Sequence, residues 1–181
     1  MINILLSTDD NYVMPTGVLM TSICENTKSK ITFYIMTNAD FKDKSKAALK
    51  RNIVMYNQKI DFIPVEASVT KDFPFGRPDQ PKHVSIATYY RLLITKLLPE
   101  DIDKIIYLDG DMIVMDDIEK YFNEDIEGYA VGAVIDQDME ENVRNERLGY
   151  PKEEGYFNAG SLLINLKYWR DHHVYAKFIK V

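Results

Sequence analysis

Short apolar runs alternate along this 181-residue chain with longer stretches in which apolar residues recur every three or four positions. A run of four to eight apolar residues is typical of a buried strand, and the recurring pattern is typical of an amphipathic helix. The runs predict strands over 2–6, 31–36, 59–65, 105–108, 130–135 and 160–166. The recurring pattern predicts helices through Leu19 and Ile23, over 41–56, over 86–98 and from about 168 onward. Three prolines between 74 and 85 predict an irregular connection.

Strands that alternate with helices predict an α/β fold, in which helices cover both faces of a mainly parallel central sheet. Such sheets bind ligands beyond the carboxyl ends of their strands. Four aspartates closely follow apolar runs, namely Asp9, Asp109, Asp111 and Asp136. We therefore expect four carboxylates to converge at one edge of the sheet.

The tripeptide Asp109-Gly110-Asp111 is the strongest single signal in the sequence. The run 112–115 is expected to continue the extended backbone, and in such a backbone side chains two residues apart point the same way. Both carboxylates then face one cation, which relieves their repulsion, and oxygen ligands suit Mn²⁺ or Mg²⁺. Gly110 lets a ligand approach the backbone closely. An acidic turn between two strands is the open alternative.

The charge of the chain is unevenly distributed. Its 22 basic and 28 acidic residues give a net charge of −6, which argues against non-specific binding of nucleic acid. Residues 100–127 hold eleven acidic and two basic residues, so this segment alone contributes −9. The acidic excess therefore surrounds the Asp109-Gly110-Asp111 tripeptide.

Cysteine content and hydropathy indicate a compartment. Cys24 is the single cysteine, the N-terminus lacks the pattern of a signal peptide, and no apolar window is long enough to cross a bilayer. These features predict a cytoplasmic protein whose membrane contact, where there is any, is peripheral.

Phosphate groups would have to be bound without a glycine-rich loop, because the eight glycines are scattered. A metal ion and basic side chains are the remaining means. Arg91 follows the proline-rich stretch and is a candidate for phosphate or sugar contact. Taken alone, Arg91 is more typical of a surface arginine on a helix.

Four blocks of residues span nearly the whole chain in a particular order. They are Ser7-Thr-Asp-Asp-Asn-Tyr12, His83-Val-Ser-Ile-Ala-Thr-Tyr-Tyr-Arg91, Ile105-Ile-Tyr-Leu-Asp-Gly-Asp-Met-Ile-Val114 and Tyr156-Phe-Asn-Ala-Gly-Ser-Leu-Leu-Ile-Asn-Leu-Lys-Tyr-Trp-Arg170. In order and spacing the blocks resemble glycosyltransferase family 8, the group that contains bacterial lipopolysaccharide galactosyl- and glucosyltransferases and glycogenin. Several ordered blocks are far more specific than one Asp-x-Asp.

The resemblance implies a GT-A (Rossmann-like) fold and a Mn²⁺-dependent or Mg²⁺-dependent transfer of galactose or glucose from a UDP-sugar. The acceptor would be a glycan or a lipopolysaccharide-type saccharide, and the anomeric configuration would be retained. By position, Asp109 and Asp111 match the metal-binding pair of the family. Asp9, Asn11 and Tyr12 match the uracil and ribose loop, Arg91, Asp136, Asn158 and Gly160 match positions around the donor sugar, and His83 matches a position near the acceptor.

Simpler interpretations exist for several of these residues. Asp9 and Tyr12 alone are typical of a helix N-cap and a half-buried tyrosine. Asn158 and Gly160 are about as typical of a tight turn that enters a strand. His83 is equally typical of a solvated loop.

Members of the family continue beyond the position of Val181, into a region that supplies another metal ligand, residues under the sugar and membrane contacts. We therefore expect 1–181 to form a single nucleotide-sugar-binding GT-A domain, C-terminally truncated relative to the family. The catalytic residue is expected beyond Val181, with contact to the inner membrane face in the same region. Weak UDP binding and poor turnover follow for this chain alone.

Two other functions stay open. A phosphatase of the haloacid dehalogenase type also places Asp-x-Asp after an apolar strand, with the first aspartate as nucleophile. Its downstream lysine and acidic pair are not evident here. A non-catalytic UDP-sugar-binding module is the other alternative.

Overall fold

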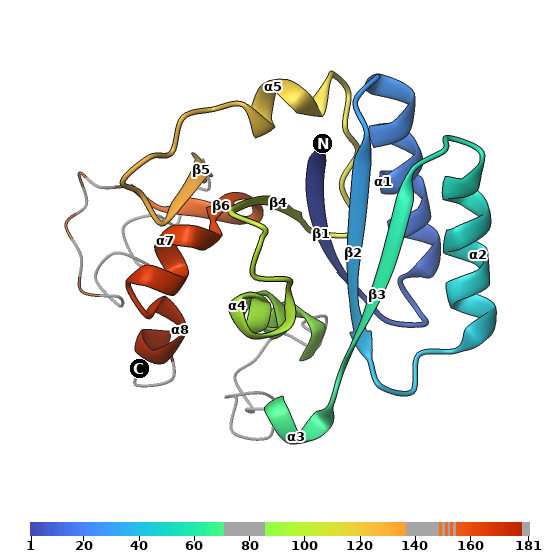
Figure 1. The fold of residues 1–181 in the computed structure, drawn as a ribbon, viewed down its shortest axis with the longest axis horizontal. Coiled ribbons are helices and arrows are strands. Elements are labelled where there is room, and N and C mark those ends of the chain that lie inside the picture. The colour runs from blue at the N-terminus through green and yellow to red at the C-terminus, as the bar shows by residue number, and fades with distance from the viewer. Residues whose placement is uncertain (71–85, 137–148, 150, 152, 154, 179–181) are drawn as a thin grey trace.

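A six-stranded, mostly parallel sheet forms the centre of the chain (Figure 1). This computed structural model describes residues 1–70, 86–136, 149, 151, 153 and 155–178. The strands are β1 (Ile2–Thr8), β2 (Ile31–Asn38), β3 (Lys59–Val65), β4 (Lys104–Leu108), β5 (Val131–Ile135) and β6 (Phe157–Asn165), in the spatial order β3-β2-β1-β4-β6-β5. Neighbours among β1 to β4 pair in parallel, whereas β6 runs antiparallel to both β4 and β5.

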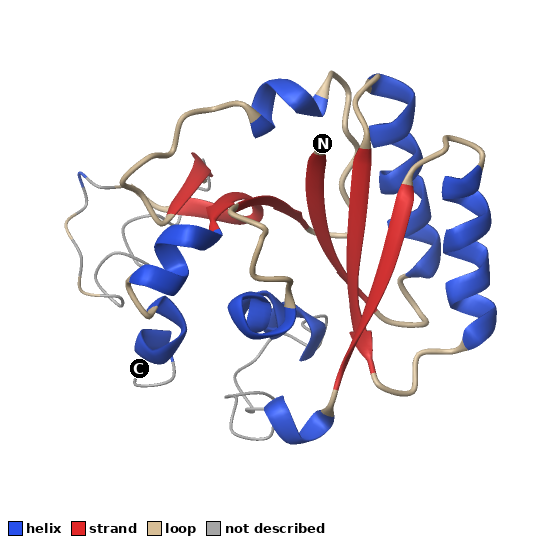
Figure 2. Cartoon of the chain, in the orientation of Figure 1, coloured by secondary structure: helices blue, strands red, loops and turns tan. Residues whose placement is uncertain are grey.

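Helices cover both faces of the sheet (Figure 2). They are α1 (Val13–Asn26), α2 (Asp43–Val54), α3 (Ala67–Thr70), the 3₁₀ helix η1 (Ile86–Leu93), α4 (Ile94–Leu97), α5 (Ile118–Phe122), α7 (Leu166–Asp171) and α8 (Val174–Phe178). Ile4 and Leu6 pack with α1 and α2, while Leu5 packs with η1, α4 and α7 on the opposite face. Because a strand alternates its side chains between faces, burial on both faces requires the continuous apolar run seen in β1. The predicted α/β fold is confirmed.

The helix predicted over 86–98 is a 3₁₀ helix followed by one α-helical turn. The buried residues of η1 are Ala87, Tyr90 and Leu93, which are three positions apart. A 3₁₀ helix has three residues per turn, so this spacing places all three side chains on one face. An α-helix would rotate them away from a common line.

No strand forms over 112–115, where the sequence predicts that the extended backbone continues. Backbone pairing cannot continue there, because the chain turns at Gly110, with the Met112 amide donating to the Asp109 carbonyl at 3.4 Å. The segment instead crosses α1, where the Ser22 hydroxyl accepts from the Val114 amide at 3.0 Å and Asn26 donates to the Val114 carbonyl at 3.0 Å. These side chains satisfy the backbone groups that a strand partner would otherwise satisfy.

The topology brings three element ends to one edge of the sheet. β1 and β4 are parallel neighbours, so their carboxyl ends meet there. Because β6 is antiparallel to β4, its first half lies at the same edge, where the Asp109 amide donates to the Gly160 carbonyl at 2.8 Å. In the described part of the chain, no helix has the length and apolar character that crossing a membrane requires.

Candidate functional site

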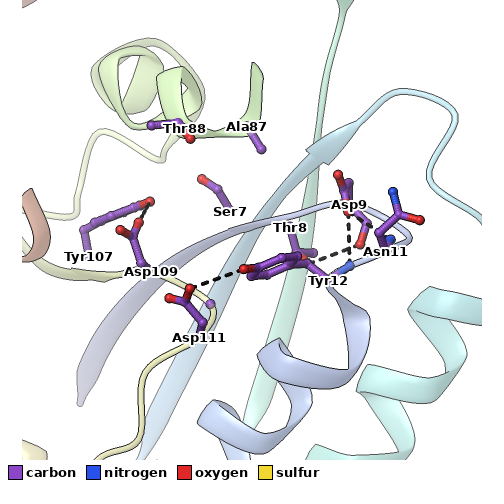
Figure 3. Close-up of a pocket in the computed structure, with 11 residues that line it drawn as sticks. Ser7, Thr8, Asp9, Asn11, Tyr12, Ala87, Thr88, Tyr107, Asp109 and Asp111 are labelled. Carbon is purple, nitrogen blue, oxygen red and sulfur yellow. Dashed lines mark hydrogen bonds between the residues drawn. The ribbon is translucent and has the colours of Figure 1, made fainter. Parts of the chain in front are cut away.

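A cleft of about 490 Å³ opens at this edge of the sheet (Figure 3). Its lining residues are Ser7, Thr8, Asp9, Asn11, Tyr12, Ala87, Thr88, Tyr107, Asp109, Gly110 and Asp111. Figure 3 shows Asp9 and Asn11 at one end, the acidic pair at the other, and the Tyr12 ring between them. Polar groups from β1, η1 and β4 therefore surround one elongated space.

Asp9 organises the loop between β1 and α1. Its Oδ1 accepts from the backbone amides of Asn11 at 2.9 Å and Tyr12 at 3.1 Å, directly before α1 begins. Asp9 is not the N-cap of α1, because the N-cap position is Tyr12 and no side chain caps the helix. Asp9 instead stabilises the turn that leads into α1, and its further lone pairs leave it able to accept from a ligand.

Tyr12 offers both a ring face and a hydroxyl to the cleft. The residue is 44% exposed, so it is half-buried, and its exposed part lines the cleft. Its hydroxyl donates to Asp111 Oδ2 at 3.3 Å, and the negative charge of Asp111 raises the pKa of Tyr12. Tyr12 thus connects the Asp9 loop to the acidic pair.

Asp109 is held by two donors on the same oxygen. Tyr107 donates its hydroxyl to Asp109 Oδ1 at 2.6 Å, and Arg91 Nη2 lies 2.9 Å from that oxygen. The Arg91 guanidinium stacks over the Tyr107 ring at 4.1 Å and also donates to the carbonyls of Thr88 and Ala159. Arg91 is therefore part of the site rather than a surface arginine. Burial raises the pKa of Tyr107 far above its ordinary value.

The two carboxylates reach the cleft through a turn, not along an extended strand. Asp111 lies in the turn that follows β4 and is exposed, whereas the Asp109 side chain is 39% exposed. Each carboxylate is bound by a different tyrosine, Asp109 by Tyr107 and Asp111 by Tyr12. The acidic turn follows β4, but no strand comes after it, and it faces a cleft instead of open solvent.

Two glycines are required by close packing at this site. A Cβ at Gly160 would lie 2.8 Å from Asp109 Oδ2 and 3.0 Å from Asn158 Oδ1. A Cβ at Gly110 would lie 3.0 Å from Thr16 Oγ1. Asn158 in turn accepts from the Gly160 amide at 2.8 Å, so both residues lie beside Asp109.

Asp136 and His83 were also predicted at the site. Asp136 follows β5 and its amide donates to the Tyr156 carbonyl at 2.7 Å, so it lies at the expected edge of the sheet. It is separated from β4 by β6 and does not line the cleft. Of the four carboxylates expected at this edge, Asp9, Asp109 and Asp111 line the cleft, whereas Asp136 lies at the same edge outside it. His83 lies outside the described residues.

Sequence reasoning gave no role to Ser7, Thr88 or Tyr107, which also line the cleft. In the sequence, Tyr107 belongs to the apolar run 105–108 that predicts a strand. A signal was present, because Tyr107 and Asp109 are two residues apart at the end of a strand and therefore share one face.

The cleft offers some, but not all, of the ligands that a hard divalent cation needs. Asp109 and Asp111 supply carboxylate oxygens, which Mg²⁺ and Mn²⁺ prefer, and no nitrogen or sulfur ligand accompanies them in the lining. Among the residues that the structure describes, no group of three or more His, Cys, Asp or Glu side chains is placed to hold a metal. The pair therefore provides two ligands of about six, and phosphate oxygens and water suit the other positions.

Comparison with known families identifies the chain. The family model described as glycosyl transferase family 8 matches residues 3–181. The chain belongs to glycosyltransferase family 8. The resemblance carried by the four sequence blocks is thereby confirmed.

Curated relatives of this family 8 chain include bacterial enzymes. A Haemophilus influenzae protein assigned as a glycosyltransferase is 35% identical over 182 residues, which cover 98% of this chain and 52% of that protein. The lipopolysaccharide 1,2-glucosyltransferase of Escherichia coli is 28% identical, over 97% of this chain and 51% of that enzyme. The chain thus spans about half the length of these curated relatives.

Solved structures support the fold of this family 8 member. The galactosyltransferase LgtC, crystallised with donor and acceptor sugar analogues, superposes with a TM-score of 0.82 at 30% sequence identity. The match covers 99% of this chain and 65% of LgtC. Together with the sheet topology, this likeness confirms the predicted GT-A fold.

Proposed function

We propose that this chain carries the UDP-sugar site of a hexosyltransferase that depends on Mn²⁺ or Mg²⁺. The observation that carries the proposal is the single cleft in which Asp9, Tyr12, Asp109 and Asp111 meet. A nucleoside diphosphate needs a ring platform, acceptors for the base and a means of neutralising phosphate, and these residues offer all three.

The proposed binding mode follows the length of the cleft. Tyr12 stacks on uracil, while Asp9 accepts from the uracil N–H and Asn11 contacts the ribose. Gly110 lets the diphosphate approach the backbone closely. Arg91, Asp136, Asn158 and Gly160 are proposed to surround the donor sugar, and His83 is proposed to lie near the acceptor.

Asp109 and Asp111 are proposed to hold the divalent ion, which would stabilise the negative charge that develops on the departing UDP. Arg91 adds a fixed positive charge beside Asp109, because its guanidinium is held by two backbone carbonyls and the Tyr107 ring. The hexose would pass through an oxocarbenium-like state with retention of configuration. This chain's residues would bind and orient the donor for that step.

The donor hexose and the acceptor are proposals for the whole protein. The Escherichia coli relative is named a lipopolysaccharide 1,2-glucosyltransferase, and a Salmonella typhimurium relative, 25% identical, is named a lipopolysaccharide 1,3-galactosyltransferase. We infer glucose or galactose as the transferred sugar and a lipopolysaccharide-type or other glycan as the acceptor. A cytoplasmic location, where UDP-sugars are made, belongs to the same proposal.

UDP release distinguishes the alternatives. We expect the purified chain to release UDP from UDP-galactose or UDP-glucose slowly and only with Mn²⁺ or Mg²⁺, and Asp111→Asn to abolish the release. UDP binding that Mn²⁺ strengthens, with no UDP release from either sugar, would assign the chain to the non-catalytic module. Absence of both binding and release would contradict the proposal.

The phosphatase alternative has little support from the site. The downstream lysine that such phosphatases require has no counterpart among the described residues that line the cleft. Membership of family 8 also argues against it. Hydrolysis of p-nitrophenyl phosphate that Asp109→Asn removes would restore this alternative.

A further inference from the structure

The Tyr107 hydroxyl binds Asp109 from inside the hydrophobic core. Tyr107 is only 1% exposed and packs with Leu5, Leu162 and the residues of η1. A buried hydroxyl requires a hydrogen-bond partner, and this one donates to Asp109 Oδ1 at 2.6 Å. The ring is fixed by packing, so the hydroxyl is fixed as well.

Arg91 reinforces the same arrangement. Its Nη2 lies 2.9 Å from Asp109 Oδ1, and its guanidinium stacks over the Tyr107 ring at 4.1 Å. Two donors therefore bind a single carboxylate oxygen. The second oxygen, Oδ2, is directed to the space beside Gly160, where a Cβ would lie only 2.8 Å away.

Because Oδ1 is occupied by protein donors, Oδ2 is the oxygen that stays available to a cation. A carboxylate held in one orientation loses less rotamer freedom when it binds an ion than a freely rotating one. Donors to the second oxygen of a ligating carboxylate generally strengthen metal binding in this way.

We propose that Tyr107 is a positioning residue for Asp109, which sets the orientation of that carboxylate for the divalent ion. The proposal rests on the proposed function, because Asp109 must be a metal ligand. Tyr107 acts through Asp109 and does not itself bind the nucleotide. It therefore affects the Mn²⁺-dependent part of UDP binding and leaves the metal-independent part unchanged.

The test uses Tyr107→Phe, which keeps the ring in the core and under Arg91 but removes the hydroxyl. We expect the affinity for Mn²⁺, followed through the electron paramagnetic resonance signal of the free ion, to fall about tenfold. The UDP dissociation constant from calorimetry should rise by a similar factor with Mn²⁺ present and by less than about twofold without it.

Tyr56→Phe is the matched control. Tyr56 also donates its hydroxyl to a carboxylate, that of Glu25, but on the α1–α2 side of the sheet. The control should leave both affinities unchanged. A variant with 4-aminophenylalanine at position 107 keeps the ring and a hydrogen-bond donor, so it should retain most of the wild-type Mn²⁺ affinity. This variant also provides a test of the proposal where Tyr107→Phe fails to fold.

Each outcome is decisive. Wild-type Mn²⁺ affinity in Tyr107→Phe, or a loss of Mn²⁺ affinity in the 4-aminophenylalanine variant as large as that expected for Tyr107→Phe, would overturn the positioning role while the proposed function stands. Loss of UDP affinity in the absence of Mn²⁺ would show direct nucleotide contact and also overturn it. Wild-type protein that binds neither Mn²⁺ nor UDP would overturn the proposed function and, with it, this inference.

Discussion

Gly160 packs so closely against Asp109 that its position has no space for a Cβ atom. A Cβ there would lie 2.8 Å from Asp109 Oδ2, and also 3.0 Å from Asn158 Oδ1 and from Met112 Cε. The Met112 side chain is flexible enough to move away. The Asp109 carboxylate is not, because Tyr107 and Arg91 hold its other oxygen.

Gly160→Ala should therefore displace Asp109 and weaken UDP binding in the presence of Mn²⁺ by about tenfold, with little change in its absence. Calorimetry with and without Mn²⁺ measures both effects. Gly17→Ala is the control, because a Cβ at Gly17 meets its nearest neighbours at 3.7 and 3.8 Å. Equal effects of the two substitutions would contradict the packing argument.

At the scale of elements, α7 depends on the residue that precedes it. Asn165 accepts from the Tyr168 amide at 2.9 Å as the N-cap and donates to the Ile126 carbonyl at 3.3 Å. This one side chain therefore starts α7 and ties the end of β6 to the segment before β5. It supports the strand that carries Asn158 and Gly160.

Asn165→Ala should lower the free energy of unfolding by about 1 kcal/mol, the usual cost of losing an N-cap. For a chain of this size the thermal midpoint should fall by about 2–4 °C. Asn123→Ala, at an exposed position after α5, should change the midpoint by less than about 1 °C. A midpoint for Asn165→Ala that matches the wild type would contradict the capping role.

The start of α2 is tied to the β1–α1 loop by Asp10. Asp10 Oδ1 accepts from the Ser45 hydroxyl at 2.5 Å and from the Lys42 amide at 3.3 Å, and its Oδ2 lies 3.5 Å from Lys42 Nζ. The Ser45 hydrogen bond is the largest cause that lowers the pKa of Asp10. The charged form of Asp10 thus joins two elements beside the cleft.

This arrangement predicts a pH-dependent contribution to stability. A lowered folded-state pKa means that the stabilisation is complete above the ordinary aspartate pKa of about 3.9 and is lost as pH falls through the folded-state value. Asp10→Asn resembles protonated Asp10, so its thermal midpoint should be below that of the wild type at pH 7 and should approach it at acidic pH. Asp61→Asn, on an exposed position of β3, is the control. A midpoint difference for Asp10→Asn that does not change between pH 7 and pH 2 would contradict the linkage.

At the scale of the whole molecule, the sequence predicts β1, β2 and β4 well, because burial on both faces demands the continuous apolar runs seen there. In β3 only Val65 is buried, and in β5 no residue is. Each of the six apolar runs that predict a strand forms a strand of the one sheet. The antiparallel direction of β6 could not be predicted, since a buried parallel strand and a buried antiparallel strand have the same composition. That direction matters, because it places Asn158 and Gly160 beside Asp109.

The site was predictable where residue type and strand position sufficed, and not where tertiary contacts decide. The positions of Asp9 and Asp109 could be predicted because each residue directly follows an apolar strand, β1 and β4 respectively. The turn at Gly110 was missed, because the apolar residues after it pack against α1 instead of pairing in the sheet. Tyr107 is a core residue, as a tyrosine in an apolar strand ordinarily is, and its hydrogen bond to Asp109 is a tertiary contact that residue type alone does not predict.

The central claim is that the cleft between β1 and β4 binds UDP through a divalent ion held by Asp109 and Asp111. Calorimetric titration of UDP into the protein, with and without Mn²⁺, tests it most directly. The account predicts that Mn²⁺ strengthens UDP binding by at least about tenfold and that the double variant Asp109→Asn/Asp111→Asn loses this gain while keeping the fold. Absence of UDP binding at millimolar ligand in both conditions, or an unchanged gain in the double variant, would contradict it.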